Sequence, residues 1–144
     1  MKIVVGYDGS ESSKKAIEKA KTLTSDCKIF KITILHVHEQ GSNKEYTPSF
    51  NLIQPKELTE VSEEVFGEEM EELKTAAQGF ENSEVETKIL KGNPSKVIAN
   101  FAREEGYDLI IVGSRGQGGL KKLLPGSVSR SIVDNCCVSV LVVK

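Results

Sequence analysis

Residues 109–127 read Leu-Ile-Ile-Val-Gly-Ser-Arg-Gly-Gln-Gly-Gly-Leu-Lys-Lys-Leu-Leu-Pro-Gly-Ser, and this stretch decides the fold. Its first four residues are all apolar, as in a strand that is covered on both faces. A glycine-rich turn follows and leads to a helix start near Gly126. Glycines let a backbone approach an anion closely, and the free N–H groups of a helix start point at it. The stretch therefore predicts a buried parallel strand with a phosphate site at its end.

Four more apolar runs lie outside this stretch, at Ile3–Val5, Ile29–Val37, Val85–Leu90 and Val138–Val143. Helix-like segments separate the runs, and strands that alternate with helices imply right-handed crossovers and a parallel sheet. The run at Val85–Leu90 alternates apolar and polar residues, which is typical of a half-exposed edge strand.

Each of the expected helices carries an apolar stripe. The first follows Ser10 as N-cap, the third follows Asn93 with Pro94 as its first residue, and the fourth begins near Gly126. The second spans about 56–77, carries a solvated acidic face and follows a polar loop at 39–55. The residues expected to face inward are Ala16, Ile17, Ala20 and Leu23 in the first helix, Val97, Ile98, Phe101 and Ala102 in the third, and Val128, Ile132 and Val133 in the fourth.

Length and composition limit the class of protein. The 144 residues fit one domain, 1–144, and a net charge of -2 argues against binding nucleic acid through bulk charge. No apolar run approaches the roughly 20 residues of a transmembrane helix, and no signal peptide is visible. The three cysteines do not suggest a disulfide framework, so we expect a reduced, cytoplasmic protein that uses neither membrane nor nucleic acid.

Two familiar phosphate motifs do not fit the glycine-rich turn. A P-loop that starts at Gly113 would need Lys-Ser or Lys-Thr where Gly119 and Leu120 stand. A dinucleotide fingerprint that starts at Gly116 would need glycine where Lys121 stands.

The spacing that remains is Gly113-x2-Gly116-x9-Gly126-Ser127. Together with Val4-Val5-Gly6-Tyr7-Asp8-Gly9-Ser10, Ile34-Leu35-His36-Val37 and the run Val138–Val143, it resembles the ATP-binding branch of the universal stress protein family, whose signature is G-x2-G-x9-G-[ST]. The resemblance covers the whole chain and implies a Rossmann-like α/β fold, with helices on both faces of one open parallel five-stranded sheet of order 3-2-1-4-5. In that order the strands that end near Asp8 and Gly113 meet at the topological switch point, where such sheets bind ligands.

The resemblance also implies a nucleotide site. The ligand would be ATP, ADP or AMP, with Mg or Mn held by the phosphates rather than by protein side chains. The resemblance assigns the triphosphate to the glycine loop and the helix start. It assigns adenine to backbone N–H and C=O groups after the second strand, and the ribose to the turn after the first strand. The residues concerned are Gly113, Gly116, Gly126, Ser127, Val128 and Ser129 for phosphate, Val37 for adenine, and Asp8 with the backbones of Gly6 and Tyr7 for ribose. Val112 precedes the loop, and Arg115 lies between its first two glycines, where a cation could meet phosphate.

Simpler interpretations stay open for several of these residues. The glycines could form only a tight connection, Asp8 could be a cap or turn residue, and Arg115 could face solvent. His36 and His38 share a strand face and could ligate a metal, but no Cys, Asp or third His lies nearby in sequence, so no protein metal site is expected.

The resemblance implies a regulatory ATP-binding stress-response protein. No general base or activated nucleophile is apparent, so we expect at most slow hydrolysis. The alternatives are a slow Mg-dependent ATPase and a stress-linked interaction dimer that does not use nucleotide. A homodimer is expected through the last strand, whose apolar residues Val138, Val140 and Val142 lie at a sheet edge in the order 3-2-1-4-5.

Overall fold

A computed structural model describes residues 1–25, 30–39, 67–81, 83–116 and 126–144. The expected loop from residue 40 onward, the first part of the expected second helix and the nine residues between Gly116 and Gly126 lie outside the described residues. The elements are β1 (Lys2–Gly6), α1 (Glu11–Thr24), β2 (Phe30–His38), α3 (Gly67–Ala76), β3 (Ser83–Lys91), α4 (Pro94–Glu104), β4 (Leu109–Gly113), α5 (Ser127–Asn135) and β5 (Ser139–Val143).

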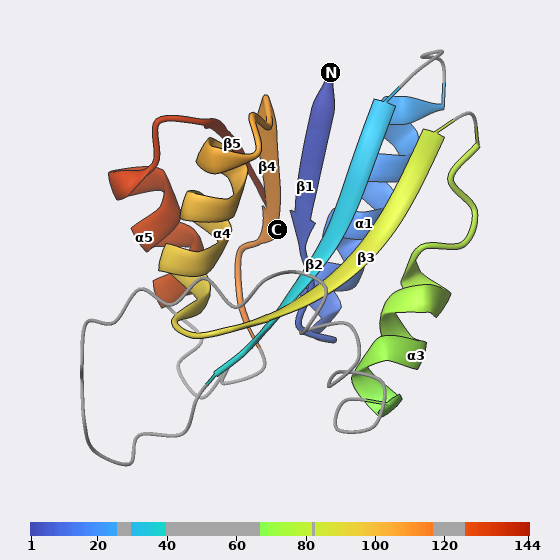
Figure 1. The fold of residues 1–144 in the computed structure, drawn as a ribbon, viewed down its shortest axis with the longest axis horizontal. Helices are drawn as coiled ribbons and strands as arrows, with labels where there is room; N and C mark the ends of the chain where they lie inside the picture. The colour runs from blue at the N-terminus through green and yellow to red at the C-terminus, as the bar shows by residue number, and fades with distance from the viewer. Residues whose placement is uncertain (26–29, 40–66, 82, 117–125) are drawn as a thin grey trace.

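The five strands form one sheet of order β3-β2-β1-β4-β5 in which every pair is parallel, and this confirms the predicted fold class. Helices α1 and α3 cover one face, and α4 and α5 cover the other (Figure 1). Successive strand residues point to opposite faces, so each central apolar run supplies both cores. In β1, Ile3 and Val5 pack under α1, whereas Val4 packs under α4 and α5, and all three are fully buried.

The predicted helix starts after Ser10 and Asn93 are confirmed. Ser10 Oγ accepts a hydrogen bond from the Ser13 backbone N–H at 3.2 Å, and Asn93 Oδ1 accepts one from Lys96 N–H at 3.2 Å. Each cap satisfies one of the N–H groups that a helix start leaves unpaired. No helix among the described segments combines the length and the hydrophobicity needed to cross a membrane.

Two residues that were predicted to face inward are exposed. Leu23 in α1 is 41% exposed and Val133 in α5 is 51% exposed. On α1 the inward position is taken by Thr24, whose hydroxyl donates to the Ala20 carbonyl at 3.0 Å. On α5 Ile132 faces the core, and the next residue of a helix is rotated by about 100° away from it. The predicted stripes were therefore one residue too wide, because periodicity alone does not give the angle at which a helix meets the sheet.

These two faces of α5 can be tested with adjacent substitutions. We expect Ile132→Ala to lower the free energy of unfolding by about 2–5 kcal/mol, because it removes a fully buried side chain. Val133→Ala, which truncates an exposed side chain, should change it by less than about 0.5 kcal/mol. Urea denaturation followed by circular dichroism measures both values, and equal losses would contradict this orientation of α5.

Candidate functional site

The strands end at different heights around β1, at the carboxyl end of the sheet. We call the place beyond Gly6, between the ends of β2 and β4, the crevice. The last β1–β2 pair joins Gly6 to Leu35, and Tyr7 N–H then donates to the Leu35 carbonyl at 2.9 Å. Strand β2 continues to His38, and β4 ends at Gly113. Beyond β1 the chain therefore leaves the sheet between the ends of β2 and β4, at the switch point where open α/β sheets bind ligands.

The turn after β4 is pressed against the first turn of α1. A Cβ atom on Gly113 would lie 2.6 Å from the Ser12 carbonyl carbon and 2.7 Å from Ser13 N. Ser12 Oγ accepts from Arg115 N–H at 3.1 Å and donates to the Arg115 carbonyl oxygen. Only glycine permits this approach at position 113, and Ser12 then fixes the backbone of the turn.

Asp8 lies between α1 and the turn after β4. Its Oδ1 accepts hydrogen bonds from Ser10 N–H at 3.0 Å and from Ser10 Oγ at 2.5 Å, so Asp8 does form the local turn that was one of its two interpretations. Its Oδ2 would lie 2.9 Å from a Cβ atom on Gly116. The structure thus brings Asp8 and Gly116 together, as the sequence predicted for the ends of β1 and β4.

The start of α5 is tied to the same turn. Gly126 N–H donates to the Ser114 carbonyl at 2.6 Å. Gly126 is the N-cap, and it provides no side-chain hydrogen bond to the helix. Ser127 is exposed, whereas Ser129 is 2% exposed and its Oγ donates to the Gly126 carbonyl at 3.1 Å. A phosphate contact through Ser129 Oγ would require that hydroxyl to exchange this bond.

Val37 offers main-chain groups to the crevice. In a parallel sheet a residue directs its N–H and C=O to one side, and successive residues alternate. The Leu35 carbonyl accepts from Tyr7 on the β1 side, so Val37 also points its backbone to that side, where β1 has ended. The His38 carbonyl accordingly accepts from Gly92 N–H on the β3 side, at 3.1 Å. The Val37 side chain is buried, and its backbone donor and acceptor face the crevice.

The other predicted residues contribute backbone or lie at the margin. The side chains of Val112 and Val128 pack into the cluster under α4 and α5, so only their backbones can serve a ligand. A Cβ atom on Gly6 would meet Val112 Cγ1 at 3.0 Å, which explains a small residue at the end of β1. Arg115 is exposed.

Tyr7 directs its side chain to the α1 and α3 face, where it packs against the core cluster of that face. There it helps to line a groove of about 960 Å³ between these two helices, together with Gly9, Ile17 and Thr75. Burial raises the pKa of the Tyr7 hydroxyl, and the carboxylates of Glu72 and Asp8 raise it further, so the phenol keeps its proton at neutral pH.

Three residues of this region escaped the sequence analysis as site residues: Ser10, Ser12 and Glu69. The two serines were visible as hydroxyl groups at the start of α1, but their bonds to Asp8 and Arg115 depend on the fold. Glu69 comes from α3 and lies beside the two histidines of β2, with its Oε1 at 3.4 Å from His38 Nδ1. A carboxylate from a distant helix thus lies beside the two histidines.

Known proteins resemble this chain over its full length. The model of the universal stress protein family matches residues 1–144. The universal stress protein YxiE of Bacillus subtilis is 32% identical, over 99% of this chain and 98% of its own length. The structure of protein MJ0577, from Methanocaldococcus jannaschii, superposes with a TM-score of 0.77 at 28% identity, covering 99% of this chain and 94% of that chain. The universal stress protein from Archaeoglobus fulgidus in complex with dAMP superposes with a TM-score of 0.65 at 21% identity, covering 100% and 98% of the two chains.

The close contact at Gly113 yields a stability prediction. Gly113→Ala should lower the free energy of unfolding by about 1–3 kcal/mol, because its Cβ would overlap the α1 backbone. The matched control is Gly67→Ala, whose Cβ would meet no described atom within 4 Å and which should cost nothing. Urea denaturation compares the two variants, and a Gly113→Ala protein as stable as the wild type would show that the turn after β4 does not press on α1.

Proposed function

Because the chain belongs to the universal stress protein family, we propose that it binds an adenine nucleotide in the crevice formed by β1, β2 and β4. We further propose that it acts as a regulatory stress-response module, which reports the nucleotide state to a partner. ATP is the first ligand to test, with ADP and AMP as its shorter forms.

The uncapped start of α5 carries this proposal. Among the described helices, α1 and α4 are capped by Ser10 and Asn93, whereas α5 has no side-chain cap and no acidic residue in its first turn. Free N–H groups and the helix dipole together favour an anion at such a start. The turn after β4 lies beside this start, since a Cβ atom on Gly126 would be 3.1 Å from the Ser114 carbonyl oxygen and 3.6 Å from Gly116 N. We assign Gly113, Gly116 and Gly126 to the phosphates, and Ser127 adds a hydroxyl donor.

The other two parts of the crevice match adenosine. Val37 offers a backbone donor and acceptor side by side, and adenine presents an amino donor next to a ring-nitrogen acceptor. Asp8, with the backbones of Gly6 and Tyr7, stands between Val37 and the glycine turn, where a carboxylate can accept the ribose hydroxyls. The dAMP complex of the Archaeoglobus fulgidus protein supports adenine nucleotides as the ligand class to test. Mg or Mn would be held mainly by phosphate oxygens and water.

We propose binding and signalling rather than dedicated catalysis. We assign the Asp8 carboxylate to the ribose, and its Oδ1 already accepts two hydrogen bonds from Ser10. A carboxylate held this way serves as a positioned acceptor and makes a poor general base. Hydrolysis of ATP with Mg, if it occurs in this pocket, would therefore be slow.

The nucleotide proposal is tested at Gly116. Gly116→Ala should displace the Asp8 carboxylate, since its Cβ would lie 2.9 Å from Oδ2. We expect ATP affinity to fall by about tenfold or more, which corresponds to roughly 1.4 kcal/mol. Gly67→Ala, whose Cβ would meet no described atom within 4 Å, should bind as the wild type does. Calorimetric titration of the full chain with ATP, ADP and AMP measures this.

If the wild type binds none of the three nucleotides, the nucleotide proposal fails and the nucleotide-independent dimer becomes the better hypothesis. Unchanged ATP affinity in a folded Gly116→Ala protein would remove Asp8 and Gly116 from the proposed site.

We also propose a homodimer through the edge strand β5. The Val143 carbonyl accepts from Ser114 N–H at 2.7 Å on the β4 side. By the alternation of a strand, Val140 and Val142 direct their N–H and C=O groups away from β4, toward the open edge. A strand with unpaired edge groups invites a second strand, and a two-fold axis would pair two β5 strands antiparallel. Val138, which precedes β5, packs under α4 and α5 beside Val140 and Val142.

The dimer proposal predicts twice the mass of one chain by light scattering at high concentration. Val140→Pro removes an outward N–H and leaves the bonds to β4 in place, so we expect a folded monomer. Hydrogen exchange on the wild type provides an independent readout, because the outward amides of Val140 and Val142 should exchange slowly only if a partner covers them. A monomeric wild type, or rapid exchange at both amides, would contradict pairing through β5.

Two of the three cysteines lie among the described residues. Cys136 and Cys137 are both free, and Cys137 is exposed. Thiols persist in the cytoplasm because it is kept reducing, and we propose that compartment for the protein.

A further inference from the structure

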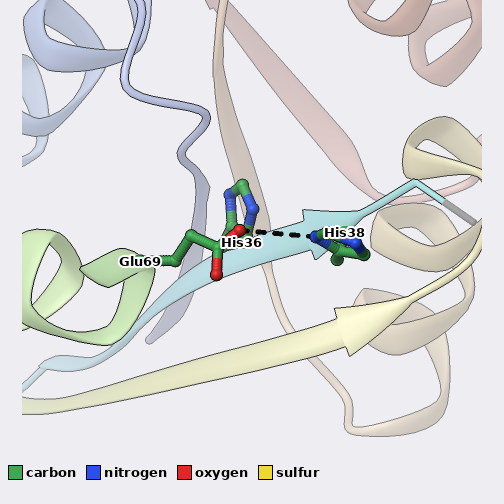
Figure 2. A group of neighbouring side chains, drawn as sticks. All are labelled: His36, His38 and Glu69. Atoms are coloured by element: carbon green, nitrogen blue, oxygen red, sulfur yellow. Dashed lines mark ion pairs between the residues drawn. The ribbon is translucent and has the colours of Figure 1, made fainter. Parts of the chain in front are cut away.

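Two histidines and a glutamate meet at the carboxyl end of β2. His36 and His38 lie two residues apart on the strand, so both side chains point to the α1 and α3 face, and Glu69 reaches them from α3 (Figure 2). One nitrogen of each imidazole and one oxygen of the carboxylate lie within 4.8 Å of one another. We propose that His36, His38 and Glu69 form a binding site for a divalent transition-metal ion, with Zn²⁺ as the reference ion.

The spacing of the donor atoms suits such an ion. His38 Nδ1 and Glu69 Oε1 are 3.4 Å apart. Two ligands at about 2.0–2.1 Å from a tetrahedral zinc lie about 3.3 Å from each other. This pair is therefore already at the separation that one shared ion would impose, and a nitrogen of His36 lies within 4.8 Å of a donor atom on each of the other two residues.

The His36 ring is held in the form that a metal ligand needs. Its Nδ1 lies 2.9 Å from the carbonyl oxygen of Tyr7. A carbonyl oxygen can only accept, so Nδ1 carries the proton and the lone pair of the neutral ring is on Nε2. Metal-binding histidines commonly donate their second N–H to a backbone carbonyl, which fixes both the tautomer and the ring orientation. Tyr7, which follows β1, thus supplies the outer contact, meaning the hydrogen bond to the ring nitrogen that does not bind the metal.

The donor set indicates which metals fit. Two imidazoles and one carboxylate suit Zn²⁺, Co²⁺ or Ni²⁺, whereas Mg²⁺ and Ca²⁺ prefer oxygen ligands throughout. The side chains of His38 and Glu69 are 42% and 36% exposed, so an ion can enter from solvent and keep water as a further ligand. A bound ion would connect α3 to the end of β2, and because it binds the folded state it would raise the melting temperature.

The test uses the untagged full chain, stripped with a chelator and free of nucleotide, so that phosphates cannot contribute ligands. Titration calorimetry with ZnCl₂ should show one ion per chain. Loss of an outer contact weakens metal sites by about 10–100-fold, so His38→Gln and Glu69→Gln, which each remove a ligand, should weaken binding by at least about 100-fold. Glu68→Gln is the matched control, since it removes the same charge from the neighbouring residue of α3 and should bind as the wild type does.

A second measurement on the wild type separates this site from the thiols of Cys136 and Cys137. Co²⁺ should give the visible bands of a nitrogen- and oxygen-bound ion, without the near-ultraviolet charge-transfer band of a cobalt thiolate. No binding by the wild type, binding that survives in both ligand variants, or a thiolate band would each overturn the proposal. Far-UV circular dichroism verifies that each variant is folded.

Discussion

The unequal length of two neighbouring strands shapes the carboxyl end of the sheet. Strand β1 stops pairing at Gly6, while β2 continues to His38 on one side of it. A backbone that leaves a parallel sheet early exposes the inner edge of its longer neighbour, and here it exposes the N–H and C=O groups of Val37. The same early departure lets Asp8 turn back toward α1, where Ser10 binds its Oδ1 and Gly116 lies beside its Oδ2.

Hydrogen bonds at the start of α1 fix the backbone on two sides of the crevice. Ser10 binds the carboxylate of Asp8, and Ser12 binds both backbone groups of Arg115. Two hydroxyls on one helical turn therefore connect the ends of β1 and β4, across a contact that only Gly113 permits. A crevice fixed by these contacts before a ligand arrives loses less entropy on binding than a mobile one would.

The end of β2 presents two kinds of chemistry in two directions. Within the plane of the sheet, the backbone of Val37 faces the crevice proposed for the nucleotide. Out of the plane, the rings of His36 and His38 face α3 and the carboxylate of Glu69. Because the two sets use different atoms, a nucleotide and a metal ion could occupy this strand end together, and the Tyr7 carbonyl links them by receiving the His36 N–H.

Local features of the chain were readable without a structure. The uninterrupted apolar residues Leu109–Val112 indicated a central strand, and Ser10 and Asn93 marked two helix starts, because caps and burial patterns depend on residues a few positions apart. The strand order followed from the family resemblance, which the glycine spacing carried. The sequence also predicted that the strand ends at Asp8 and Gly113 would converge, since those two strands flank the switch point.

The tertiary structure alone decided the features that join distant segments. The angles at which α1 and α5 rest on the sheet exposed Leu23 and Val133, although both fit an apolar helical stripe. Glu69 lies 31 residues after His38 in the chain, and its carboxylate is 3.4 Å from the His38 ring. No hydrophobic periodicity in the sequence predicts this contact. A contact of this kind depends on how far β2 extends and where α3 lies across it. Those positions result from packing the whole core together, whereas a sequence pattern reports only on its own neighbourhood.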